Sequence, residues 1–202
     1  MANSKLSLIN NALILIGDVP LTSLTSGTRA QIVATTLYDN IVQSELSKFR
    51  WGFARRQEEL VRAGAPGVGI LKPLFDWSAV YRLPVNMISL IRLSPSIPYQ
   101  VYAEEITSPE PAGNQAVYVN YESDLFADYI YNVPEVDWPP YFSKMIEYAL
   151  AMDFAPSIRD SASSMQLLAN QYLNASRMAR FTDSQQHPQT AIQDRPFINV
   201  RY

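Results

Sequence analysis

Residues 28–60 read TRAQIVATTLYDNIVQSELSKFRWGFARRQEEL, and this stretch contains the change of periodicity that decides the fold. Apolar residues from Ala30 to Phe49 recur every three or four positions, which predicts a helix over residues 28–49. From Trp51 onward the pattern changes to short runs rich in aromatic and β-branched residues, separated by turn residues. We therefore expect a helical part before Trp51 and a β part after it.

The segment before this stretch predicts one more helix, over residues 4–16. Its apolar residues also recur at intervals of three and four. Asn3 or Ser4 can cap its first turn, and Gly17 can end it, because glycine readily adopts the left-handed conformation found after helix ends. The chain therefore begins with two helices.

Helical spacing returns after Pro139 and Pro140, which suit a first helical turn but not a helix interior. We expect this third helix to break at Pro156. A fourth helix is expected over residues 160–181.

Between the helical segments, glycine and proline residues divide the chain into short runs typical of antiparallel strands. The run from Gly64 to Gly69 has little side chain to pack and is expected to form a mobile loop. The strands form a small sheet or a sandwich. They are expected at residues 53–60, 78–83, 88–93, 99–103, 116–121 and 128–132.

The predicted fold is α+β, a four-helix bundle of two N-terminal and two C-terminal helices with an inserted antiparallel β domain. Residues 1–50 and 139–182 form the bundle, residues 51–138 form the β domain, and residues 183–202 form an extended C-terminal docking tail. A chain of this length can bury a core without disulfides.

Charge is sorted along the chain. The formal net charge is −3, from 16 basic and 19 acidic residues, which argues against a dedicated nucleic-acid binder. Residues 93–143 contain no Lys or Arg but eight acidic residues. We interpret these acids as covering a solvated or pore-facing surface, with Glu104, Glu105, Glu122 and Asp124 as candidates for an acidic lumen or rim.

Composition excludes several kinds of chemistry. The absence of cysteine removes disulfides, thiolate nucleophiles and Cys-ligated zinc, and leaves the redox compartment open. The single histidine, His187, lies in a polar segment and is more readily a solvated residue than a catalytic base. No phosphate-binding glycine motif occurs, so no metal and no cofactor are predicted. The apolar run at residues 6–16 is interrupted and short, which predicts neither a signal peptide nor a membrane anchor.

Paired carboxylates are the one catalytic alternative that composition allows. Glycoside hydrolysis needs two acids about 5 to 9.5 Å apart. Glu104 and Glu105 are adjacent and would point to opposite faces of a strand, whereas Glu135 and Asp137 can share a side. Tyrosines on the predicted sheet can stack on sugars, although a core or interface role is the simpler interpretation. They are Tyr99, Tyr102, Tyr118, Tyr121, Tyr129 and Tyr131.

The C-terminal segment loses apolar periodicity and then ends in a late apolar cluster of Phe197, Ile198, Val200 and Tyr202. Either this tail is disordered or it docks on a neighbouring subunit or on another protein. Burial contributes about 1.5 to 3 kcal/mol for each such side chain before ordering costs. We therefore favour docking, with β-strand addition as one mode.

The order and spacing of several short motifs resemble the tail tubular protein A family, the head-to-tail adaptors of short-tailed bacteriophages. The resemblance covers residues 5–181. The matching positions in the N-terminal part are Asn11-Ala12-Leu13, Leu15-Ile16-Gly17, Pro20-Leu21, Ser23-Leu24, Tyr38-Asp39, Leu46, Trp51-Gly52-Phe53-Ala54 and Leu60. Those that follow are Trp77, Tyr81-Arg82-Leu83-Pro84, the strand pair at residues 99–106 and 117–121, and the helix at residues 142–154.

This resemblance implies a structural protein and not an enzyme. It implies a dodecameric ring between the portal protein and the tail nozzle protein, with double-stranded DNA passing through its lumen without sequence-specific contacts. The protein would act in the virion at the head–tail interface and in the host cytoplasm during assembly, with no membrane partner. The alternatives are a virion-associated protein that binds or hydrolyses glycans through the paired carboxylates, and a monomeric scaffold module.

Overall fold

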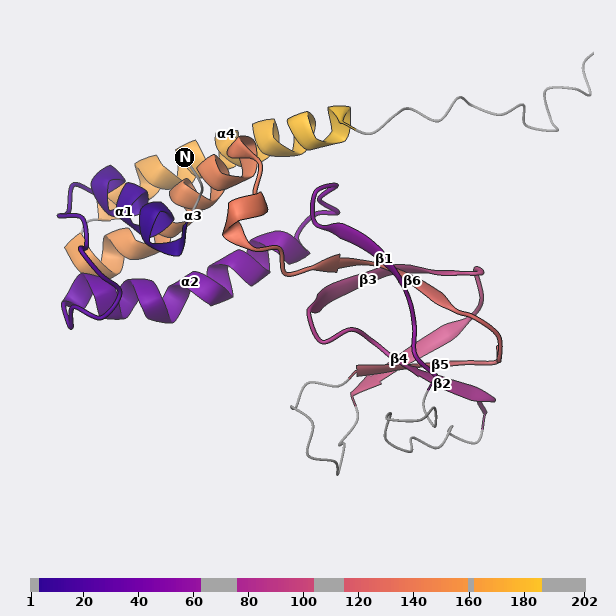
Figure 1. Cartoon of the computed structure of the whole chain (residues 1–202). Helices are drawn as coiled ribbons and strands as arrows, with labels where there is room; N and C mark the ends of the chain where they lie inside the picture. Colours follow the sequence, from indigo (N-terminus) through magenta and orange to yellow (C-terminus); the bar gives the residue numbers. More distant parts are fainter. Residues whose placement is uncertain (1–3, 63–75, 104–114, 160–161, 187–202) are drawn as a thin grey trace, which may run out of the picture.

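The computed structural model describes residues 4–62, 76–103, 115–159 and 162–186, and it shows helices at one end and strands at the other (Figure 1). The fold class is α+β, as predicted. In chain order the elements are α1 (Lys5–Leu15), α2 (Arg29–Ser47), β1 (Arg55–Glu59), β2 (Ala79–Arg82), β3 (Met87–Ser94), β4 (Tyr99–Ala103), β5 (Gln115–Val119), β6 (Phe126–Tyr131), the 3₁₀ helix η1 (Glu135–Asp137), α3 (Pro140–Arg159) and α4 (Ala162–Gln185).

The first two helices begin where the sequence predicts. Ser4 caps α1 through a capping box with Ser7, and Gly17 follows the helix with a φ of 77°. Thr28 caps α2 by accepting a hydrogen bond from the backbone N–H of Gln31.

Helix α3 is the central helix, because it packs against α1, α2 and α4. It begins at Pro140, as expected, but the predicted break at Pro156 is wrong, since the helix continues to Arg159. A proline removes the hydrogen bond to the carbonyl four residues earlier and crowds that carbonyl, but Pro156 lies near the helix end, where only a few residues of helix follow. Ile158, beyond the proline, still packs against the core, which favours continuation of the helix.

Helix α4 extends to Gln185, past the predicted end at residue 181. Asp183 is buried, and its carboxylate accepts hydrogen bonds from the backbone N–H of Gly52 (2.9 Å) and the hydroxyl of Tyr141 (2.8 Å). The predicted tail boundary at residue 183 is therefore wrong, because residues 183–185 belong to this helix.

The six strands form two three-stranded antiparallel sheets, with strand orders β1-β6-β3 and β2-β5-β4. Each predicted strand overlaps one of these elements. The two sheets share one hydrophobic cluster, to which Tyr129 of β6 and Val117 of β5 contribute side chains with no exposed surface. The β part is thus two packed sheets and not a single one. The predicted loop at Gly64–Gly69 lies outside the described residues.

A second, larger cluster joins the helices to the first sheet. Trp51 lies at the point where α2 gives way to β1, and its ring makes edge contacts with Phe49 and Phe142, each at a centroid distance of 5.0 Å. Ile130 of β6 belongs to the same cluster, so the core continues from the helices into the sheet. The aromatic residue that marks the change of periodicity therefore also fills the junction between the two parts.

One acid of the acidic segment lies in an unexpected place. Asp128, on β6, has a buried side chain that accepts hydrogen bonds from Nε of Arg55 on β1 (2.6 Å) and from Nε of Arg92 on β3 (3.1 Å). The prediction that the acids of residues 93–143 cover a surface is thus wrong for Asp128. Its two cationic partners come from the neighbouring strands.

Candidate functional site

The side of α4 that points away from α3 has an unusual composition, and we call it the α4 outer face. From Met165 to Gln185, twelve side chains of this helix are exposed and one of them, Arg177, is charged. An ordinary soluble surface is roughly 25–35% charged, which predicts about three or four charges among twelve residues. The face consists of Met165, Gln166, Leu167, Asn170, Gln171, Leu173, Asn174, Arg177, Met178, Phe181, Ser184 and Gln185.

Large apolar side chains lie along this face. Leu167, Met178 and Phe181 are 61%, 63% and 59% exposed. Protein interfaces are enriched in Met, aromatic residues and Arg, and are depleted in Lys, Glu and Asp. The α4 outer face has this composition and is therefore a candidate surface for contact with another protein.

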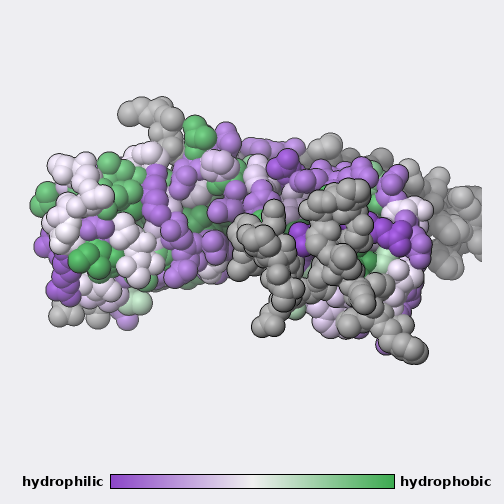
Figure 2. Space-filling view, turned by 60° about the horizontal axis from the view of Figure 1, so that its bottom comes forward, coloured by the Kyte–Doolittle hydropathy of each residue, from purple (hydrophilic) through white to green (hydrophobic). Residues whose placement is uncertain are grey.

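The exposed side of α2 carries an ordinary share of charge, two charged residues among eight, and we call it the α2 outer face. Its charged residues are Arg29, at the first position of the helix, and Asp39, near its middle. Figure 2 is turned so that the lower edge of Figure 1, where α2 lies, comes toward the reader. In this view hydrophobic residues form separate patches at the helical end of the molecule. The face consists of Arg29, Ile32, Thr36, Asp39, Asn40, Gln43, Ser44 and Ser47.

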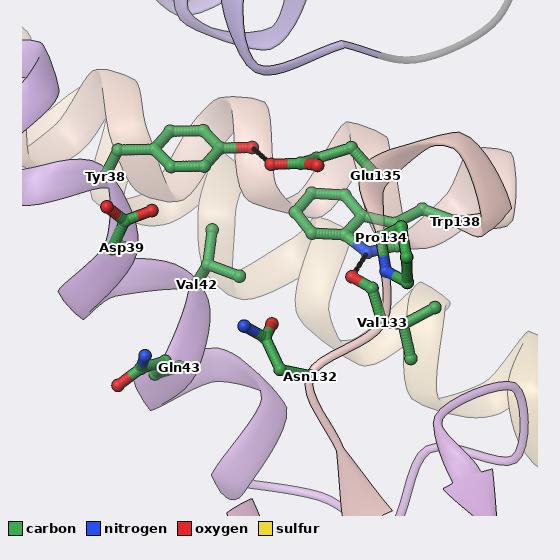
Figure 3. A pocket seen from close by; sticks show the side chains of 9 residues that line it. All are labelled: Tyr38, Asp39, Val42, Gln43, Asn132, Val133, Pro134, Glu135 and Trp138. Atoms are coloured by element: carbon green, nitrogen blue, oxygen red, sulfur yellow. Dashed lines mark hydrogen bonds between the residues drawn. The ribbon is translucent and has the colours of Figure 1, made fainter. Parts of the chain in front are cut away.

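A pocket of about 250 Å³ opens beside the α2 outer face, between α2 and the connection from β6 to α3 (Figure 3). Both of its charged lining residues, Asp39 and Glu135, are acidic, and we call it the acidic pocket. Its other walls are the aromatic side chains of Tyr38 and Trp138, apolar side chains and amide groups. The lining residues are Tyr38, Asp39, Val42, Gln43, Asn132, Val133, Pro134, Glu135 and Trp138.

The two carboxylates of the acidic pocket differ in their partners. Asp39 forms an ion pair with Lys5 (2.8 Å), whereas Glu135 accepts a hydrogen bond from the hydroxyl of Tyr38 (3.1 Å; Figure 3). Burial and then the nearby charge of Glu135 raise the pKa of Tyr38 well above its ordinary value, so this hydroxyl stays protonated. Within the described ranges, Glu135 has no cation at ion-pair distance. The pocket therefore presents one carboxylate whose charge is not matched.

The sequence hypothesis of paired carboxylates placed Glu135 and Asp137 on one side of a connection. Both lie in η1, but Glu135 lines the acidic pocket and Asp137 does not. The structure therefore brings Glu135 together with Asp39 and not with Asp137.

Two of the four candidate lumen residues lie in the described part of the chain. Glu122 and Asp124 are exposed at the turn between β5 and β6. They line a second pocket, of about 410 Å³, together with Glu59 and Arg62, and Arg62 is 3.4 Å from the carboxylate of Glu122. The structure thus gathers three acids and one arginine at this end of the sheets. Glu104 and Glu105 lie outside the described residues.

Most of the tyrosines that the sequence assigns to the predicted sheet are at least partly buried. Tyr118 and Tyr129 are buried, and Tyr121 and Tyr131 are partly buried. Tyr99 and Tyr102 are exposed, and both lie on β4, an edge strand whose five side chains are all exposed. The tyrosines therefore do not form one aromatic platform on the described surface.

The residues proposed for tail docking, Phe197, Ile198, Val200 and Tyr202, lie outside the described residues, as does His187. Sequence reasoning missed the α4 outer face, although the scarcity of charge in residues 162–185 was a visible signal. It also missed the pairing of Asp39 with Glu135 in one pocket, because these residues are 96 positions apart.

No helix in the described part of the chain is both long and apolar enough to cross a membrane. Over the same residues, no group of three or more His, Asp or Glu side chains is arranged so that it could hold a metal ion. In comparisons with known proteins, no family model and no curated protein matches the chain.

Proposed function

We propose that this chain is a structural head-to-tail adaptor of a short-tailed bacteriophage, of the tail tubular protein A type. Copies of the chain close into a ring, dodecameric as the resemblance implies, between the portal and the tail nozzle. The four helices form the bundle that carries the subunit contacts, and residues 187–202 form the docking tail. The protein works by assembly and not by catalysis.

The α4 outer face carries this proposal. A helix that displays Leu167, Met178 and Phe181 to water, with one charge among twelve exposed residues, has the composition of a subunit interface. The matching motifs, which lie between residues 11 and 154 and resemble the adaptor family, indicate the kind of assembly. These two lines of support are independent, because the motifs include no residue of this face.

The acids at the turn between β5 and β6 suit a protein through which DNA passes. Glu122 and Asp124 add negative charge to an exposed part of the molecule. Negative charge repels DNA phosphates, so a surface of this kind does not retain DNA during passage. We place this turn at the lumen or rim of the ring.

The experiment is reconstitution with the portal protein encoded by the same genome. Purified chain is mixed with preformed portal rings, and the particles are imaged by electron microscopy, with portal rings alone as the control. We expect an added ring of density on one side of the portal. Portal rings that stay bare at saturating chain concentration would contradict the proposal.

A further inference from the structure

The α4 outer face and the α2 outer face lie on different sides of the helical part. Both helices pack against α3, and the exposed residues of each are those that this packing leaves uncovered. The two faces therefore cannot cover each other within one chain. They can meet only between two copies, in a heterologous contact, which repeats around a ring if the rotation closes.

The acidic pocket beside the α2 outer face carries charge of the opposite sign to the cation of the α4 outer face. Arg177 is the cation of the α4 outer face, and within the described ranges it forms no ion pair. The α2 outer face adjoins the acidic pocket, where the charge of Glu135 is unmatched and Asp39 already has Lys5 as its partner. The unpaired cation Arg177 thus lies on one face, and the unpaired carboxylate of Glu135 lies beside the other.

The acidic pocket also has the shape and chemistry for an arginine side chain. Arginine buries its apolar stem against apolar walls and presents its guanidinium group to carboxylates and carbonyl oxygens. Val42 and Val133 supply apolar walls, and Asn132 and Glu135 supply polar groups, in a cavity of about 250 Å³. Figure 3 shows Val42 of α2 and Asn132 and Glu135 of the connection that leads to α3 turned toward the same space.

We propose that the α4 outer face of one copy docks on the α2 outer face of the next copy, with Arg177 entering the acidic pocket. This inference rests on the proposed ring and adds the residues that close it. The chain therefore has a donor side on α4 and an acceptor side on α2, and successive copies join donor to acceptor.

The contact area is small, and this determines which experiment can detect the contact. From Leu167 to Phe181 the face is about 21 Å long at 1.5 Å per residue, and a helix is about 10–12 Å wide. The resulting area of a few hundred Å² is below the roughly 800 Å² per partner of a stable interface. Two isolated copies therefore associate weakly, and the contact is best detected by covalent trapping.

The chain contains no cysteine, so introduced cysteines report on one contact at a time. A donor copy carries Asn174→Cys on the α4 outer face, and an acceptor copy carries Gln43→Cys beside the acidic pocket. Both are full-length and are mixed at equal concentration with a short bis-maleimide. We expect donor–acceptor dimers at a yield at least tenfold above donor–donor and acceptor–acceptor dimers, because the contact is heterologous. As a matched control, an acceptor with Gln57→Cys on the exposed strand β1 should give only the background yield.

Charge changes made separately in the two copies test the role of the arginine. Arg177→Glu in the donor should lower the yield at least tenfold, and Glu135→Arg in the acceptor should restore it when paired with that donor. Arg50→Glu, at another exposed arginine, is the charge-matched control and should leave the yield unchanged. Circular dichroism and thermal unfolding of each variant check that the chain remains folded.

The outcomes separate this inference from the proposed function. Equal yields for all cysteine pairs, or predominant donor–donor dimers, would overturn the docking scheme. If portal-bound rings form but donor and acceptor cysteines are not bridged within them, the docking scheme is wrong and the adaptor function stands. If the expected dimers form and are lost with Arg177→Glu, the scheme is supported, even where portal rings stay bare and the adaptor function fails.

Discussion

Asp128 lies buried on the central strand of its sheet, between arginines on the two neighbouring strands. Burial alone would raise the pKa of this carboxyl, but the hydrogen bonds and charges of Arg55 and Arg92 outweigh burial and lower it. A lowered native-state pKa means that the ionised form stabilises the fold. This contribution is present above the ordinary carboxyl pKa and is lost as the pH falls through the lowered native-state value.

We therefore expect Asp128→Asn to reduce the free energy of unfolding by about 1.5–3 kcal/mol at neutral pH, the usual range for hydrogen bonds to charged groups. Urea unfolding at a series of pH values measures this, and the difference from the natural chain should shrink in acid, where the aspartate is also neutral. The exposed Asp124→Asn is the matched control. A difference that stayed constant or grew in acid would show that the arginine contacts do not stabilise the fold.

The sequence could not predict this arrangement. Arg55 and Arg92 are 73 and 36 positions from Asp128, so the charge pattern showed only an acid in a segment without cations. The charge pattern along a sequence shows where one sign of charge is in local excess. It does not show that an acid is neutralised by arginines on neighbouring strands, because that pairing depends on strand register. Glu122 and Asp124 come from the same segment and are exposed, as predicted.

Helix α3 continues through Pro156, which is exposed and supplies no backbone N–H. Pro156→Ala should restore the hydrogen bond to the carbonyl of Met152. We expect the free energy of unfolding to rise by about 1 kcal/mol, because the greater freedom of the unfolded alanine chain offsets part of the helix gain. Thermal and urea unfolding measure the change. A decrease would mean that the proline fits this turn better than alanine.

Helix α4 ends with Asp183 bound to Gly52 and Tyr141, so the position of a C-terminal truncation matters. A chain that ends at Gln186 should unfold at the same urea concentration as the full chain. One that ends at Thr182 should lose about 1–3 kcal/mol, because Gly52 and Tyr141 lose a charged hydrogen-bond acceptor. Equal stability of the two truncated chains would show that Asp183 does not hold this helix end. Weaker portal binding by the first chain would support the tail-docking hypothesis.

Periodicity predicted most elements because caps and turns agreed with it. Ser4 and Thr28 begin their helices as expected. The errors lie at Pro156 and at residues 183–185, where packing against the core or a buried hydrogen bond extends a helix beyond its local preference. The candidate site was harder to predict, since the acidic pocket joins α2 to a distant connection.

The whole molecule is a helical part and a pair of sheets, with separate hydrophobic clusters that meet near Trp51. Its exposed helix faces should matter for assembly but not for folding. We expect Leu167→Asp to change the free energy of unfolding by less than about 0.5 kcal/mol, as is usual for exposed positions. The same substitution should abolish the added ring on portal particles, as seen by electron microscopy.

Val61→Asp is the matched control for this test, because Val61 is also an exposed apolar residue but lies in the β part. It should leave ring formation intact. If both variants formed rings as well as the natural chain, the α4 outer face would have no role in assembly.

The hydrogen bonds of Asp183 also affect how the fold resists a pulling force. They fasten the last turn of α4 to Gly52, where α2 gives way to the first strand, and to Tyr141 at the start of α3. Tension applied to the chain beyond Gln186 would thus be shared by three segments before α4 could unwind. A subunit held by its C-terminal end would therefore pass the pulling force to the centre of its fold. In single-molecule pulling experiments, we expect one unfolding event at high force and not a gradual unwinding of α4.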